Sequence, residues 1–222
     1  MRVDRPAREG SARSFTASAS LLPVLFLQKR RPWHDASSVI FEDTGLAGAW
    51  AIELERIADA RGFFARVFCA REFAERGLAT RFVQSSVSFN ARAGTLRGMH
   101  FQLPPYRETK LVRCTAGAIW DAIVDLRADS PTRLRWFGTE LSAANRRMLY
   151  IPAGFAHGFV TLEPESEVFY EMDEYYAPEA GRGVRWNDAA FGIRWPKSPE
   201  VIADRDASYP DFDPKLSAEI GS

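Results

Sequence analysis

Short apolar segments recur along the chain from about Phe41 onward. They are rich in Val, Ile, Phe, Trp and Tyr, and turn-forming residues separate them at frequent intervals. Segments of this length and composition are typical of β-strands. The predicted strands cover residues 47–54, 63–68, 81–89, 110–115, 118–126, 135–141, 148–151, 158–162 and 167–172. Because helical segments do not alternate with them, the pattern favours an all-β sandwich, jelly roll or barrel.

Turns and a few short helices are predicted between the strands. Residues 59–62 have the composition of a tight turn, and Ala116-Gly117 is a hairpin signal between two strand-like segments. A short helix is expected at residues 70–76, ended by a glycine at position 77. Beyond Tyr176, frequent Pro and Gly predict a segment that wraps around the barrel and contains at most a short helix at residues 188–192.

The first 38 residues differ in composition from the rest of the chain. Several arginines lie in a Ser- and Ala-rich stretch, followed by the apolar run LLPVLFL and then by QKRR. This order resembles a signal peptide, but the apolar run is short, contains Pro23 and lacks a small-residue cleavage site. We therefore expect residues 1–38 to be a disordered or non-native extension, and residues 39–222 to form a single domain.

Composition and charge narrow the classes of partner. Lys plus Arg and Asp plus Glu both total 29, so the chain has no excess of positive charge that would predict nucleic acid as a partner. No apolar run is long enough to cross a membrane. The two cysteines, Cys69 and Cys114, are far apart and lack a C-x-x-C context, which predicts a reduced cytoplasmic protein.

The stretch GTLRGMHFQ, residues 94–102, contains several candidate functional residues. It contains Arg97, two glycines and His100, and a second histidine, His157, follows in IPAGFAHGF. A metal site would need further ligands at suitable spacing, which neither histidine has nearby, although two histidines with a distant carboxylate would still suit iron. Acid–base chemistry fits better, because imidazole titrates near neutral pH. Packing of both histidines in a core remains the alternative.

Strand periodicity raises a question about Arg97. Residues three apart in a regular strand point to opposite faces, so Arg97 and His100 share a pocket only if Gly98 marks a bulge or if Arg97 precedes the strand. Lys110 shares a face with Val112 and Cys114 and is expected to point inward, where a lysine needs a charged or polar partner.

Two further residues have both a chemical and a structural interpretation. Tyr170 shares a face with Val168 and Met172, so it either packs in the core or serves as a proton donor. Arg61 lies in the turn of DARGFF, where a guanidinium is either solvated or binds a phosphate.

These motifs together resemble the dTDP-4-dehydrorhamnose 3,5-epimerase family of cupin-fold sugar-nucleotide enzymes. The resemblance covers residues 41–212, and IPAGFAHG also matches the second cupin motif, whereas the metal-binding H-x-H of the first motif is absent. It rests on DARGFFARVF, GTLRGMHFQLPP, KLVRCTAGAIWDAIVDLRADSPT, LSAANRRMLYIPAGFAHGF, EVFYEMDEYYAPEAGRGVRWND and FGIRWP, in that order. It implies an all-β cupin-type double-stranded β-helix, a jelly-roll barrel with a few short peripheral helices.

The resemblance also implies an activity and roles for residues. The expected reaction converts dTDP-4-dehydro-6-deoxy-D-glucose to dTDP-4-dehydro-L-rhamnose without a cofactor or a metal. His100 matches the base, Asp206 the carboxylate that orients it, Lys110 the residue that stabilises the enolate and Tyr170 the general acid. The positions that match substrate-binding residues are Arg61, Gln84, Arg97, His157 and Tyr176. Members are usually homodimers that exchange an N-terminal strand.

Three departures from the family pattern leave the sugar, the base and the number of inverted carbons open. Arg66 stands where a glutamate is common, Ser86 replaces an asparagine, and Tyr106 stands where a histidine is common. The alternatives are a 3- or 5-monoepimerase or a 3,4-ketoisomerase acting on a related dTDP-4-keto-6-deoxyhexose. A non-catalytic sugar-nucleotide-binding cupin is the alternative from another class.

Overall fold

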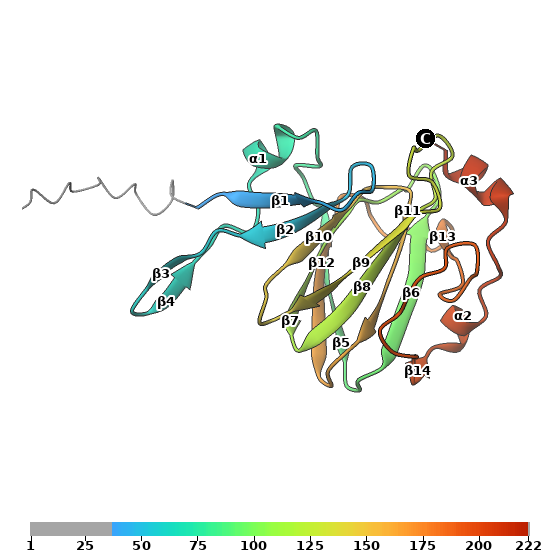
Figure 1. Ribbon diagram of the computed structural model, residues 1–222. Helices are drawn as coiled ribbons and strands as arrows, with labels where there is room; N and C mark the ends of the chain where they lie inside the picture. The colour runs from blue at the N-terminus through green and yellow to red at the C-terminus, as the bar shows by residue number, and fades with distance from the viewer. Residues whose placement is uncertain (1–36, 222) are drawn as a thin grey trace, which may run out of the picture.

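A computed structural model describes residues 37–221, and two antiparallel β-sheets face one another in it (Figure 1). The predicted extension, residues 1–38, lies outside the described residues except for Ser37 and Ser38, which hydrogen-bond Glu55. The first sheet contains, in spatial order, β1 (Val39–Asp43), β2 (Trp50–Leu54), β10 (Met148–Ile151), β7 (Lys110–Ala116), β12 (Ser166–Met172) and β5 (Gln84–Asn90).

The second sheet is built around β6 and β11. Its spatial order is β13 (Gly181–Gly183), β6 (Thr95–Gln102), β11 (Phe155–Thr161), β8 (Ala118–Asp125) and β9 (Trp136–Ser142), and β14 (Val201–Ile202) pairs parallel to β6. A separate hairpin of β3 (Ile57–Asp59) and β4 (Gly62–Phe64) projects away from the sheets (Figure 1). The all-β jelly-roll prediction is confirmed.

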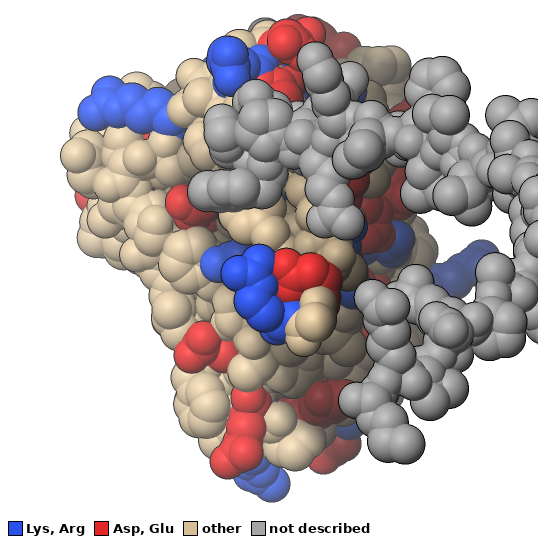
Figure 2. Space-filling view, turned by 90° about the vertical axis from the view of Figure 1, so that its left-hand side faces the viewer, with Lys and Arg blue, Asp and Glu red and all other residues tan. Residues whose placement is uncertain are grey.

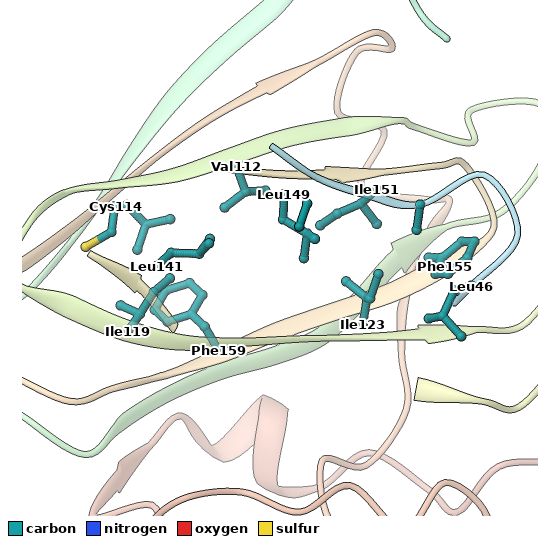
Figure 3. Close-up of a cluster of buried hydrophobic side chains, with 13 residues drawn as sticks. Leu46, Val112, Cys114, Ile119, Ile123, Leu141, Leu149, Ile151, Phe155 and Phe159 are labelled. Atoms are coloured by element: carbon teal, nitrogen blue, oxygen red, sulfur yellow. The ribbon is translucent and has the colours of Figure 1, made fainter. Parts of the chain in front are cut away.

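The core lies between the two sheets. Alternate residues of each strand point inward, so Val112 and Leu149 of the first sheet meet Ile119, Ile123 and Phe159 of the second (Figure 3). Most of these side chains are fully buried, and each contributes roughly 1.5–3 kcal/mol through removal of its apolar surface from water. The two sheets are therefore held together by side chains that the alternating pattern places on their facing sides.

Two smaller clusters cover the outer faces of the sheets. The short helix α1 (Ala70–Ala74) packs Phe73 against Ile52, Leu111 and Met148 on the outside of the first sheet. The C-terminal segment packs Val184, Phe191 and Ile220 against Met99 and Phe101 on the outside of the second sheet. The chain beyond Tyr176 therefore wraps the barrel as predicted, but it also extends the second sheet through β13 and β14.

The hairpin predicted at Ala116-Gly117 is wrong. β7 and β8 belong to different sheets, so the chain crosses from one sheet to the other at Gly117. Gly117 has a φ of +66°, and a Cβ there would lie 2.5 Å from Ser166 Oγ. The dipeptide does reverse the chain, but both strands carry apolar inward faces, and these pack face to face across the core instead of pairing edge to edge.

Residues 188–192, where at most a short helix is expected, form a turn. The Asp188 carboxylate accepts hydrogen bonds from the backbone N–H groups of Ala190 and Phe212, which competes with helix formation. Two short helices, α2 (Asp204–Ala207) and α3 (Pro214–Ile220), instead lie farther along. The start of α3 carries a recognisable signal, since Asp213 caps the Lys215 N–H and Pro214 occupies the first turn.

Candidate active site

A bulge in β6 places Arg97 and His100 on the same side of the strand. His100 lies opposite His157 of β11, whereas Arg97 lies opposite Phe159, so β6 has one residue more than β11 between these pairs. Gly98 has a φ of +136°, and a Cβ there would lie 2.4 Å from the Gly158 Cα. Only glycine fits this position, and the bulge resolves the conflict between Arg97 and strand periodicity.

An Asp–His pair is built on this bulge. His100 Nε2 lies 2.8 Å from Asp206 Oδ1, and the other carboxylate oxygen accepts the Gly98 backbone N–H at 3.1 Å. Asp206 comes from α2, and its side chain is 7% exposed, whereas that of His100 is 36% exposed. The carboxylate therefore holds the imidazole from behind, while the ring faces open space.

The electrostatics of Asp206 favour its ionised form. Burial by itself raises the pKa of this carboxyl group, but the hydrogen bonds from His100 and the Gly98 N–H outweigh it and hold the pKa below its ordinary range. An ionised Asp206 accepts the proton-bearing Nε2 of a neutral imidazole. Nδ1 then carries the free lone pair, which is the state that a base requires.

Lys110 and Tyr170 reach the same space from the opposite sheet. Lys110 starts β7 and Tyr170 lies on the neighbouring β12, where both side chains point toward the space between the sheets. Lys110 is buried, and its ammonium pairs with Glu108 at 2.9 Å. Burial raises the pKa of the Tyr170 phenol, with the positive charge of Arg97 opposing this rise and the negative charge of Glu108 adding to it. Tyr170 is therefore protonated at neutral pH.

His157 forms a second Asp–His pair. Its Nε2 lies 2.8 Å from Asp121 Oδ2, Asp121 is fully buried, and the His157 side chain is only 10% exposed. Asp121 was missed by sequence reasoning, although a signal exists. It lies between Ile119 and Ile123 on an inward-facing strand pattern, where an acidic residue needs a partner.

These side chains surround a cavity that has an inner and an outer part, with three lining residues in common. Its inner part has a volume of about 80 Å³ and is lined by Arg97, His100, Lys110, His157, Phe159 and Tyr170. An outer part of about 250 Å³ shares His100, Lys110 and Tyr170 with it and adds Ser86, Tyr176 and Arg205. Across residues 37–221, no group of three or more His, Cys, Asp or Glu side chains is arranged to hold a metal ion. The arrangement suits proton transfer on a small polar substrate.

Two of the predicted substrate-binding residues, Gln84 and Arg61, do not line the cavity. Gln84 supports the outer part indirectly, because its side-chain oxygen accepts the Tyr176 backbone N–H at 2.7 Å. Arg61 lies on the projecting β3–β4 hairpin, where its side chain is 89% exposed and pairs with Asp59 at 2.5 Å. Within one chain, Arg61 is therefore not brought together with His100 (Figure 1).

Comparison with known proteins shows which family the chain belongs to. The family model described as dTDP-4-dehydrorhamnose 3,5-epimerase matches residues 43–214. The chain belongs to this family. A dTDP-4-dehydrorhamnose 3,5-epimerase from Methanothermobacter thermautotrophicus is 47% identical over 172 residues, which cover 76% of this chain and 92% of that protein.

Solved structures of similar proteins share the fold. The crystal structure of a dTDP-4-dehydrorhamnose 3,5-epimerase from Bacillus anthracis, with TDP and PPi bound, is 43% identical with a TM-score of 0.75, covering 79% of this chain and all of that chain. A 3′-monoepimerase from Streptomyces bikiniensis, in complex with dTDP-quinovose, is 29% identical with a TM-score of 0.72, covering 80% of this chain and 90% of that chain. The 3,5-epimerase family fold therefore accommodates inversion at one carbon as well as at two.

For this member of the 3,5-epimerase family, Glu108 is the second residue that sequence reasoning missed. It lies two positions before Lys110, so the two side chains point the same way in an extended segment. An acidic residue at that spacing from an inward-facing lysine is the signal that identifies its partner.

Proposed function

We propose that this chain catalyses 3,5-epimerisation of dTDP-4-dehydro-6-deoxy-D-glucose to dTDP-4-dehydro-L-rhamnose. The observation that carries the proposal is the placement of His100, backed by Asp206, on one wall of a cavity whose opposite wall presents Lys110 and Tyr170. Inversion of a carbon centre needs a base on one face of the sugar ring and an acid on the other. The second sheet supplies the wall with the base, and the first sheet supplies the wall with the acid.

His100 starts the proposed reaction as the base. Its Nδ1 takes the proton from a carbon next to the C4 ketone, and the electrons of the C–H bond move into the carbonyl to form an enolate. The resulting imidazolium is stabilised by the ionised Asp206 at 2.8 Å. The exposure of His100 to the cavity, compared with the nearly buried His157, makes His100 the histidine that reaches substrate.

Lys110 and Tyr170 complete each inversion in this proposal. The Lys110 ammonium stabilises the negative charge that develops on the C4 oxygen. The Tyr170 hydroxyl then donates its proton to the opposite face of the same carbon, and the ketone forms again as the enolate electrons return. A proton from His100 leaves to solvent and Tyr170 regains one, so the cycle consumes nothing but substrate, and the same steps invert the second carbon.

The remaining polar residues are proposed to bind the sugar nucleotide. Arg97 is held by hydrogen bonds from its Nε to Asn90 at 2.8 Å and from its Nη2 to the Phe89 carbonyl oxygen at 3.5 Å, and its side chain lines the inner part of the cavity. His157 forms part of the wall around the sugar, while Tyr176 and Gln84 shape the outer part that suits the nucleotide. The two cysteines, Cys69 and Cys114, are both free, in keeping with the proposed cytoplasmic location. Among the described residues, no helix has the length and apolar character needed to span a membrane.

Product analysis tests this function directly. Purified protein incubated with dTDP-4-dehydro-6-deoxy-D-glucose should yield a product whose proton NMR couplings show inversion at both C3 and C5. Inversion at a single carbon would make the protein a monoepimerase, and migration of the keto group to C3 would make it a ketoisomerase. Binding of dTDP without turnover would leave only the sugar-nucleotide-binding alternative.

We further propose that Arg61 completes the cavity of a second copy of the chain in a homodimer that exchanges its N-terminal strand. The β3–β4 hairpin projects from the barrel and exposes Phe63 and Phe64, an arrangement that favours contact with another chain (Figure 1). On the side of the molecule that carries this hairpin, most of the visible surface is uncharged and charged side chains form small groups (Figure 2).

Subunit complementation tests the role of Arg61. Co-expressed chains with different affinity tags, one carrying Arg61→Ala and the other His100→Asn, should form heterodimers with turnover far above that of either homodimer. One of their two cavities then combines an intact His100 with an Arg61 from the other chain. Heterodimers of His100→Asn with Lys110→Met are the control, since each cavity retains one defect and turnover should stay low. Equal inactivity of both heterodimers would refute contribution across the interface.

A further inference from the structure

Glu108 introduces a negative charge into an otherwise basic cavity. Among the described residues that line its two parts, Glu108 is the only acidic one. The other charged or titratable side chains that line the cavity come from several elements: Arg97 and His100 from β6, Lys110 from β7, His157 from β11, Tyr170 from β12, Tyr176 from the loop after β12, Arg182 from β13 and Arg205 from α2. Asp173, which follows β12, also lies near Glu108: burial raises the pKa of its carboxyl group, and the negative charge of Glu108 adds to that rise. A carboxylate in the position of Glu108 requires an explanation, because its negative charge opposes the binding of an anionic substrate.

The carboxylate is fixed at both of its oxygens. Oε1 lies 2.9 Å from Lys110 Nζ, and both side chains are only 11% exposed. Oε2 accepts a hydrogen bond from Gln102 Nε2 at 3.3 Å. A pair shielded from water in this way is more strongly coupled than a surface ion pair.

Several hydrogen bonds fix the side chain of Gln102 in turn. The two N–H groups of this buried residue are shared among three acceptors, because the carbonyl oxygens of Tyr106 at 2.9 Å and Tyr175 at 3.2 Å lie within reach as well as Glu108, and its own oxygen accepts the Ala177 N–H at 2.6 Å. It therefore ties β6 to the loop that carries Glu108 and to the loop that carries Tyr176. Glu108 cannot rotate away from Lys110 without giving up this contact.

We infer that Glu108 is a positioning residue, which holds the Lys110 ammonium in the direction of the substrate's C4 oxygen and is itself fixed by Gln102. The inference rests on the proposed role of Lys110. A lysine carries its charge on a flexible four-carbon stem, so its direction is poorly defined unless a partner fixes it. One N–H directed at Glu108 leaves two for the developing enolate oxygen.

The same carboxylate influences the proposed acid. The pKa of Tyr170 is raised mainly by burial, and the charge of Glu108 adds to this effect against the opposing charge of Arg97. Removing that charge therefore lowers the pKa of Tyr170. Since Tyr170 has to be protonated to donate, the loss of activity at high pH should then begin at a lower pH.

The Glu108→Gln variant tests the inference with a side chain of the same size. We expect kcat to fall roughly 10–100-fold, as for other residues that orient a catalytic group, with KM little changed and the alkaline limb of the pH profile displaced to lower pH. Glu171→Gln is the matched control, because Glu171 is a half-buried carboxylate next to Tyr170 that points out of the cavity. It should leave kcat and the alkaline limb unchanged. Thermal stabilisation by dTDP verifies that each variant is folded.

A double-mutant cycle with Lys110→Met separates positioning from a direct effect. If Glu108 acts through Lys110, then Glu108→Gln causes no further loss in the Lys110→Met background. Wild-type kcat in Glu108→Gln, or an equal loss in both backgrounds, would overturn the inference while leaving the proposed reaction intact. Wild-type turnover in Lys110→Met alone would instead remove the proposed role of Lys110, and the inference with it.

Discussion

The His100→Asn variant is expected to lose roughly 10²–10⁴-fold in turnover, the range that general-base catalysis contributes. Asparagine can still hydrogen-bond Asp206 but cannot take a proton from carbon. The defect should appear in kcat, because Tyr176 and Gln84, which are proposed to shape the nucleotide part of the cavity, do not lie on the strand that carries His100. Steady-state kinetics with dTDP-4-dehydro-6-deoxy-D-glucose measure it, and thermal stabilisation by dTDP shows that the cavity is still formed.

His157→Asn is the matched control for that loss. His157 has the same 2.8 Å contact with a carboxylate, but its side chain is 10% exposed compared with 36% for His100. A wall residue should affect substrate binding more than proton abstraction, so a smaller fall in kcat is expected. If His157→Asn were the more damaging substitution for kcat, the assignment of the base would have to be reversed.

The Gly98→Ala variant is expected to be destabilised by about 2–5 kcal/mol, the combined cost of overpacking and of a side chain at positive φ. The added Cβ would meet the Gly158 Cα at 2.4 Å and the His157 carbonyl oxygen at 3.0 Å. Both neighbours are backbone atoms, so no side chain can rotate to make room. Urea denaturation measures the loss, and the displaced bulge should also lower activity because it carries both Arg97 and His100.

Gly62→Ala separates these two causes. Gly62 has a similar φ of +130°, but nothing lies within 4 Å of an added Cβ. This variant should therefore show only the cost of the backbone conformation, about 1–2 kcal/mol. Equal destabilisation of the two variants would show that the contact between β6 and β11 contributes nothing.

Strand positions and inward faces follow from the alternation of the sequence. Lys110 is a good example, because its two apolar companions at positions 112 and 114 were enough to place it inside. The same reasoning shows that Arg97 conflicts with strand periodicity and leaves two explanations open, a bulge at Gly98 or a strand that starts after Arg97, and the structure shows the bulge. Alternation does not show which strands pair, and the crossing at Gly117 was therefore mistaken for a hairpin.

The contacts between distant segments depend on the whole fold. Asp206 lies more than a hundred positions after His100, and no local pattern links the two, so only the family resemblance indicated the pair. Asp121 and Glu108, in contrast, were within reach of residue-level reasoning. Each is an acidic residue on an inward-facing pattern, and such a residue has to meet a basic partner.

Solvent exchange tests the central claim most directly. The protein is incubated with dTDP-4-dehydro-6-deoxy-D-glucose in deuterium oxide, and the sugar nucleotides are analysed by mass spectrometry and proton NMR. Proton abstraction by His100 and return of a solvent-derived proton by Tyr170 predict deuterium at both C3 and C5, and none in the His100→Asn variant. Absence of deuterium at both carbons, from protein that is stabilised by dTDP, would contradict the account.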